Sequence, residues 1–145
     1  MPKNTITNRM QAFIVTLIGA GYLGFSSIEL PHDKLIHFIT FFLLTLEFFF
    51  IFQTKKIKQL IYITFIICTL GGSIASEFLQ NFINPSRIFD INDIFYNVGG
   101  SIVALIISGV SSSWNRRRRY KRLDREDVET EEYININMQD IPRDT

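Results

Sequence analysis

The chain has 145 residues, which is enough for one domain. The formal net charge of the chain is +1, whereas a nucleic-acid-binding domain is usually strongly basic. We therefore expect no nucleic-acid partner. Its single cysteine, Cys68, excludes an intrachain disulfide and lies in an apolar run, where we expect it to pack as a small apolar residue. Residues 10–114 are mostly apolar and residues 115–145 mostly charged, which predicts a membrane domain followed by a solvated tail.

Four apolar runs predict four transmembrane helices, at about residues 10–28, 35–53, 59–79 and 92–113. Each run is close to the roughly 20 residues that a helix needs to cross a bilayer. A cleaved signal peptide is the alternative for the first run, but that run is longer than an apolar signal-peptide core of about 7–15 residues. A soluble bundle would show charged outer faces at helical spacing, which these runs lack. We therefore predict an all-α, four-helix transmembrane bundle with short loops.

The distribution of Lys and Arg predicts the orientation of this bundle. Basic residues gather in residues 1–9, in the turn at 53–58 and at the start of the tail, and four helices place these three segments on one side. The other two turns contain only Lys34 and Arg87. The positive-inside rule then predicts an integral, multi-pass membrane protein with both termini in the cytosol. An endomembrane and a plasma membrane both fit this pattern.

The segment 115–145 begins with a basic cluster and then turns acidic, without the apolar periodicity of a packed fold. We therefore expect a disordered cytosolic tail. Basic residues beside a membrane helix attract anionic lipids, and the same residues also serve as a plain topology anchor. The cluster comprises Arg116, Arg117, Arg118, Arg119, Lys121 and Arg122.

Small residues recur at four-residue spacing in the third and fourth runs. The repeats are Gly71/Ala75, Gly72/Ser76 and Gly100/Ala104/Ser108. Because lipid gives no hydrophobic drive for helix association, such residues favour close backbone approach. We expect the third and fourth helices to be in close contact.

The predicted topology brings two polar segments to the same, non-cytosolic end of the bundle. One is the start of the second helix, where Asp33 and His37 are four residues apart and share a face, with Lys34 beside them. The other joins the third and fourth helices, and its polar residues recur at helical spacing. They are Glu77, Gln80, Arg87, Asp90, Asp93 and Asn97. Asp90 is suited to cap the fourth helix.

These two segments contain four carboxylates but only two full cations, Lys34 and Arg87. The excess of negative charge leaves room for a bound cation, a protonated acid, or a cationic or hydroxyl-rich ligand. Converging carboxylates and a histidine can hold a divalent metal, but no metal motif such as HExxH is present, and we predict no metal and no cofactor. The structural alternative is a network in which Arg87 bridges Asp90 or Glu77.

Taken together, these residues resemble the VanZ-like family of small membrane proteins. The resemblance rests on DKLIHFITFFLLT, on ASEFLQNFINPSRIFDINDIFYNVGG and on their order within four helices, and it covers roughly residues 10–110. The family pattern is Asp-Lys-x-x-His-Phe, then Glu-x-x-Gln, then Arg-x-x-Asp-x-x-Asp, then an Asn followed by small residues. It falls here on Asp33, Lys34, His37 and Phe38; Glu77 and Gln80; Arg87, Asp90 and Asp93; Asn97, Gly99 and Gly100. The resemblance implies a four-helix membrane domain over residues 10–114. The charged tail lies outside it, and we do not transfer the antibiotic resistance of the family's namesake.

Three functions fit this sequence, and no protein partner follows from it. The first is an extracytoplasmic polar pocket for a ligand such as a lipid headgroup or a glycan, and we favour this non-enzymatic function. The second is a membrane-embedded enzyme acting on a lipid-linked substrate, with His37 as a general acid or base oriented by Asp33 or Glu77. The third is a structural or assembly protein that acts through its helices and tail.

Overall fold

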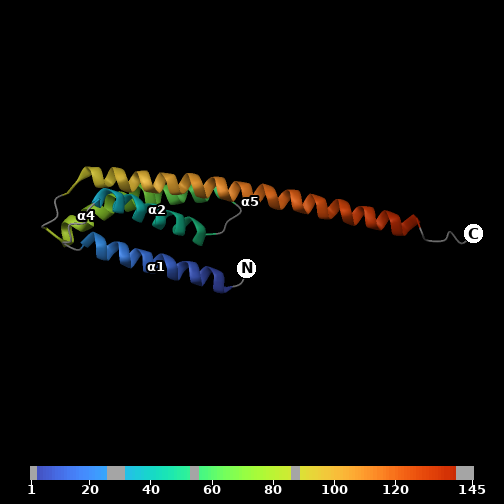
Figure 1. Cartoon of the computed structure of the whole chain (residues 1–145), viewed down its shortest axis with the longest axis horizontal. Helices are drawn as coiled ribbons and strands as arrows, with labels where there is room; N and C mark the ends of the chain where they lie inside the picture. The colour runs from blue at the N-terminus through green and yellow to red at the C-terminus, as the bar shows by residue number, and fades with distance from the viewer. Residues whose placement is uncertain (1–2, 26–31, 53–55, 86–88, 140–145) are drawn as a thin grey trace, which may run out of the picture. The chain divides into compact units, whose positions relative to one another are not determined.

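The computed structural model describes residues 3–25, 32–52, 56–85 and 89–139, and these ranges contain helices and short connecting residues but no strand. The elements are α1 (Lys3–Phe25), α2 (Asp33–Ile51), α3 (Ile57–Thr64), the π-helical η1 (Phe65–Gly72), α4 (Ser73–Ile83) and α5 (Ile91–Gln139) (Figure 1). Because α3, η1 and α4 follow one another without a break, the described residues form four continuous helices. The predicted all-α, four-helix fold is confirmed.

Three of these helices are long and apolar enough to cross a bilayer. They are α2, the continuous helix Ile57–Ile83, and the part of α5 from Ile91 to Ile134. Among the described residues α1 does not qualify, since it begins at Lys3, earlier than the predicted start, and includes the polar stretch TITNRMQ. The last three residues of that predicted span, 26–28, lie outside the described ranges. Three helices of this length and apolar character indicate that the chain is an integral membrane protein.

Residues 1–110 form one compact unit, and its interior is polar while its exterior is apolar. Among the described residues, 11 polar side chains are buried against only five apolar ones. Large apolar side chains such as Ile18, Tyr62 and Ile106 are instead exposed. This distribution suits helices surrounded by lipid, where hydrogen bonds and close packing hold the helices together.

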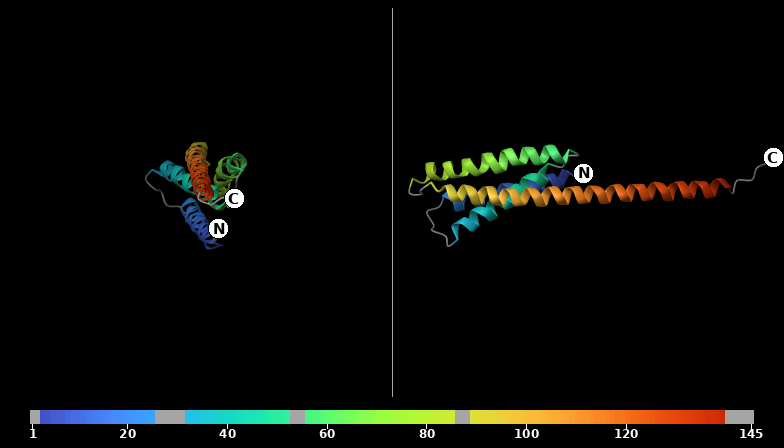
Figure 2. Two further views of the ribbon diagram at one scale, coloured as in Figure 1. Left: turned by 90° about the vertical axis from the view of Figure 1, so that its right-hand side faces the viewer. Right: turned by 90° about the horizontal axis from the view of Figure 1, so that it is seen from above.

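The two ends of this unit differ in chemistry. One end has a small apolar core, formed by Phe49, Leu60 and Leu105. The start of α1 lies near this end, because Arg9 Nη1 donates a hydrogen bond of 2.6 Å to the carbonyl oxygen of Phe50, at the end of α2. The other end contains the start of α2, the end of α4 and the start of α5, as the views in Figure 2 show. The predicted polar residues that the structure describes lie there.

Gly100 in α5 allows the backbones of α2 and α5 to come into direct contact. A Cβ atom at Gly100 would overlap the carbonyl oxygen of Phe38, and would lie 3.1 Å from the backbone nitrogen of Phe42. Gly72 also faces α2, since a Cβ there would lie 3.4 Å from Cε1 of Phe41. We expected these glycines to join the third and fourth helices, but their close approach is to α2. Helices η1 and α5 contact each other instead through hydroxyl groups.

The π-helical segment keeps one face of the third helix turned toward the interior. The buried residues along that helix are Leu60, Thr64, Thr69, Ser73, Glu77 and Gln80. Their spacing is four, five, four, four and three residues, and the step of five runs from the last residue of α3 into η1. In an α-helix one extra residue would rotate the following face by about 100°. The wider turn of the π-helix absorbs this residue, so the buried face continues from α3 into α4.

Residues 111–145 form a second compact unit. We expected disorder after residue 114, whereas the structure continues α5 to Gln139, and residues 140–145 lie outside the described ranges. Every described side chain from Ser113 to Ile134 is exposed, as expected for a segment without apolar periodicity. Local contacts one turn apart support this helix, including Arg118 above the ring of Trp114 at 5.0 Å and Arg116 above that of Tyr120 at 5.6 Å.

Candidate functional site

His37 lies at the centre of a buried polar cluster that joins α2, α4 and α5. Its Nδ1 lies 3.1 Å from Oδ1 of Asn97, whose Nδ2 donates a hydrogen bond of 3.2 Å to Oγ of Ser76. The Ser76 hydroxyl in turn donates to the carbonyl oxygen of Ser73 at 3.0 Å. His37 is only 6% exposed and Asn97 is fully buried, so three helices share one hydrogen-bonded chain inside the bundle.

Two carboxylates flank the other nitrogen of the same imidazole. His37 Nε2 lies 3.4 Å from Oδ2 of Asp93 and 3.9 Å from Oδ2 of Asp33. Asp33 is on the first turn of α2, which confirms that it shares a face with His37, and Asp93 is on the first turn of α5. Asp93 is buried, whereas the Asp33 side chain is 38% exposed. One acid thus lies inside the bundle and the other at its edge.

Glu77 and Asp90 connect α4 to the start of α5. The buried Glu77 accepts a hydrogen bond of 3.0 Å at Oε1 from the backbone nitrogen of Asp90. The Asp90 carboxylate accepts one of 2.8 Å from the backbone nitrogen of Asn92, which confirms the predicted helix cap. Chiefly because of that backbone hydrogen bond, the pKa of Asp90 is below its ordinary value. Glu77 therefore holds Asp90, the residue that caps α5.

Replacing Asp90 by Ala should modestly lower the melting temperature of the purified protein, because the α5 N-terminus loses its cap. Asp90→Asn keeps a capping oxygen and should lie near the wild type. Since the native pKa of Asp90 is lowered, its carboxylate stabilises the fold above the ordinary Asp pKa, and this contribution disappears as the pH falls through the native pKa. Equal melting temperatures for Asp90→Ala and the wild type at neutral pH would contradict the capping role.

The structure places eight of the nine predicted site residues, and Arg87 lies outside the described ranges. Five of them belong to the contacts above: Asp33, His37, Glu77, Asp93 and Asn97. Asp90 serves as the cap, and Lys34 is exposed next to the cluster. Gln80 is buried against α1, since a Cβ at Gly24 would lie 2.7 Å from its Nε2. The predicted grouping is therefore found, with α1 as an additional wall. The predicted bridge from Arg87 to Asp90 or Glu77 concerns a residue that the structure does not describe.

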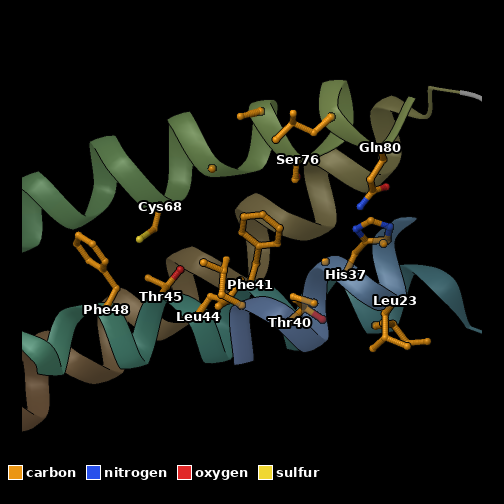
Figure 3. Close-up of a pocket in the computed structure, with 18 of the residues that line it drawn as sticks. Leu23, His37, Thr40, Phe41, Leu44, Thr45, Phe48, Cys68, Ser76 and Gln80 are labelled. Atoms are coloured by element: carbon orange, nitrogen blue, oxygen red, sulfur yellow. The ribbon is translucent and has the colours of Figure 1, made fainter. Parts of the chain in front are cut away.

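A cavity of about 420 Å³ opens from this cluster between α1, α2 and the η1–α4 helix. Most of its wall is apolar, with Phe41, Leu44 and Phe48 from α2 among the lining residues. Figure 3 shows His37 and Gln80 near each other at one end and Phe48 and Cys68 toward the other. The cavity therefore has a long apolar part and a polar end that carries the histidine.

A second group of buried hydroxyls was not predicted from the sequence. Ser101 Oγ lies 2.7 Å from Oγ1 of Thr45 and 2.7 Å from Oγ1 of Thr69, and all three side chains are fully buried. The signal was present, because Thr45 is eight residues after His37 and Ser101 four after Asn97, on the same helix faces. This group continues the polar interior from the candidate site toward the middle of the bundle.

Glu47 is an isolated acid among phenylalanines in α2, and α1 provides its contact. Thr16 Oγ1 donates a hydrogen bond of 3.0 Å to Glu47 Oε1. The second oxygen, Oε2, is buried and has no hydrogen-bond partner among the described residues. The contact ties α1 to α2, away from the polar end of the cavity.

Comparisons with known proteins agree with this arrangement. The model of the VanZ/LLP1 family matches residues 2–111, which include the four helices up to the middle of α5. An uncharacterized protein of Schizosaccharomyces pombe is 40% identical over 98 residues, which cover 66% of this chain but only 59% of that protein. An uncharacterized protein of Saccharomyces cerevisiae is 31% identical over 91 residues, which cover 58% of this chain and 84% of that protein. No solved structure matches.

Proposed function

Because the chain belongs to the VanZ/LLP1 family, we propose that it is a multi-pass membrane protein that binds a lipid between α1, α2 and α4, with the polar headgroup at His37. The observation that carries this proposal is the amphipathic cavity, whose apolar wall ends at a cluster of polar side chains. The cluster lies at the end of the bundle that the distribution of basic residues assigns to the non-cytosolic side.

The size and lining of the cavity fit part of a lipid. Its volume of about 420 Å³ lies within the roughly 300–1,000 Å³ of small-molecule sites, which are mostly apolar with a few oriented polar groups. The wall from Phe41 to Phe48 offers dispersion contacts to an acyl or isoprenoid chain. A lipid tail can enter such a cavity from the bilayer without first crossing water.

The polar end offers groups of both signs to a headgroup. Asp33, His37, Ser76 and Gln80 line this end. The carboxylate accepts hydrogen bonds from hydroxyls or amines, and the Gln80 amide both donates and accepts them. The exposed Lys34 lies next to Asp33 and adds a positive charge at the edge of the cluster. These groups suit a hydroxylated or charged headgroup, including a glycan.

Filling the cavity should reduce lipid binding. Ala20 lines the cavity from α1, so Ala20→Phe places a ring in the space that a lipid chain would occupy. Native mass spectrometry of the protein purified in mild detergent should show at least about a tenfold loss of copurifying lipid, equivalent to roughly 1.4 kcal/mol of binding free energy. Ile18→Phe is the matched control, because Ile18 is 67% exposed on the same helix.

Equal lipid occupancy in the Ala20→Phe and Ile18→Phe proteins would contradict this proposal. The same spectra address the enzymatic alternative, for which the supporting observation is that His37 lines the cavity between two carboxylates. A chemically altered lipid found with the wild type, but absent from both Ala20→Phe and His37→Gln, would favour turnover over simple binding.

A further inference from the structure

We propose that a basic segment of α5, residues 116–122, binds the headgroups of anionic phospholipids where this helix leaves the bilayer. The segment follows the apolar part of α5 without a break in the helix. Its positive side chains are all exposed, and they are Arg116, Arg117, Arg118, Arg119, Lys121 and Arg122. This second lipid site differs in chemistry from the cavity at His37, and it does not depend on the function proposed above.

The positive side chains of this segment surround the helix instead of forming one face. Each residue turns an α-helix by about 100°, so the consecutive arginines at 116–119 point in different directions. Lys121 and Arg122 fall between these directions, and no arc wider than about 100° lacks a positive charge. A protein docked on one side of the helix would contact only part of this charge. Lipid headgroups surround a membrane-spanning helix on every side, so they match the distribution.

The side chains of the segment lean back toward the apolar part of α5. Cα–Cβ bonds in a helix tilt toward its N-terminus, and Arg118 accordingly lies above the ring of Trp114 at 5.0 Å, one turn earlier. Trp114 is 58% exposed and belongs to the residue types that gather at the membrane–water interface. From residue 116 to 122 the helix rises by about 9 Å, whereas the headgroup layer on each side of a bilayer is roughly 5–8 Å thick. Long basic side chains that lean toward the bilayer therefore reach lipid phosphates.

The acidic residues farther along α5 leave these charges available to lipid. Residues 124–132 contain six carboxylates, but Arg117, Arg119 and Arg122 form no ion pair with any residue that the structure describes. An anionic bilayer surface attracts the basic segment and repels the acidic one. The order of the two segments along the helix therefore favours contact of the first with the bilayer and keeps the second away from it.

Guanidinium groups suit phosphate-bearing headgroups, because they bind phosphate oxygens through paired hydrogen bonds. The distribution of basic residues predicts that this end of the bundle is cytosolic, and the cytosolic leaflet is the one that carries anionic phosphatidylserine and phosphatidylinositol lipids. From the sequence, lipid attraction and a plain topology anchor both account for the basic residues. The two differ in one respect, because only lipid binding requires the charges to lie at the depth of the headgroups.

The single tryptophan of the chain, Trp114, reports on the lipids around this segment. The full chain is reconstituted into vesicles of phosphatidylcholine and phosphatidylserine in equal amounts, with quenching bromine atoms on the acyl chains of one lipid or the other. We expect brominated phosphatidylserine to quench Trp114 fluorescence more strongly than brominated phosphatidylcholine. Arg117→Gln should lower the binding constant for phosphatidylserine, relative to phosphatidylcholine, by about fivefold, as expected for one basic residue near an anionic surface.

Arg125→Gln is the matched control, because it removes the same charge from the same exposed helix about 12 Å farther along, beyond the roughly 8 Å screening length at physiological salt. Both variants should unfold at the wild-type temperature, since Gln and Arg have similar helix propensities. Equal quenching of the wild type by the two brominated lipids would overturn the proposal. So would equal relative binding constants for Arg117→Gln and Arg125→Gln, which would show a topology anchor only. Neither result bears on the lipid in the cavity, which the Ala20→Phe variant tests separately.

Discussion

Replacing Gly100 by Ala should strongly destabilise the bundle, although Ala is otherwise the better helix former. A Cβ at this position would overlap the Phe38 carbonyl oxygen and lie 2.9 Å from its carbon. These are backbone atoms of α2, so a change of rotamer cannot relieve the overlap and the two helices must move apart. Overpacking in a well-packed interior costs about 1–3 kcal/mol, and we expect the upper end of that range or more. Thermal unfolding of the protein in detergent measures the effect.

Gly99 provides a control next to it on the same helix. A Cβ at Gly99 would lie 3.6 Å from Cε2 of Phe38, which is an ordinary contact. Gly99→Ala should therefore be neutral, or stabilising by up to the roughly 0.5–1 kcal/mol that separates Gly from Ala within a helix. A melting temperature of Gly100→Ala at or above that of Gly99→Ala would show that α2 and α5 do not meet at this distance.

Inserting a single residue into η1 should disrupt the candidate site from a distance. An Ala added after Ile66, which is 41% exposed, is a second extra residue beyond the one that the π-helix absorbs, and it rotates α4 by about 100° relative to α3. The rotation takes Ser76 away from Asn97 and Glu77 away from the Asp90 backbone. Each buried polar group left without its partner costs about 1–3 kcal/mol. We therefore expect a large fall in melting temperature and loss of bound lipid.

Ile66→Ala separates the effect of rotation from that of a local change of side chain in η1. This variant keeps the length of the chain and should lie near the wild type, since Ile66 is outside the buried face. If the insertion and Ile66→Ala have the same stability and the same lipid occupancy, the register of α4 does not determine the site.

The candidate site could be predicted in large part because its residues recur at helical spacing. The four-residue interval between Asp33 and His37 and the capping chemistry of Asp90 are local properties, and the structure shows both. The predicted return of two polar segments to one end of the bundle places Asn97 beside His37, 60 residues away in the sequence. These features follow from periodicity and topology alone.

Other features depend on which helices are neighbours, and sequence spacing does not contain that information. The repeat containing Gly100 predicts a close approach but not its partner, and the partner is α2. The contribution of α1 to the cavity was missed for the same reason, since Gly24 becomes informative only once Gln80 lies opposite it. The five-residue step from Thr64 to Thr69 indicates a π-helical segment only once both residues are known to be buried.

The polar interior has a consequence for the biogenesis of this protein. Insertion of each span depends on its hydropathy, which is carried mainly by the outward-facing apolar side chains. Association of the inserted spans depends on a different set of residues, such as Asn97 and Ser101, which contact neighbouring helices. Variants of these inner residues should therefore still enter the bilayer and span it, and fail only at the later stage of helix assembly. Such chains would remain as separated, inserted helices.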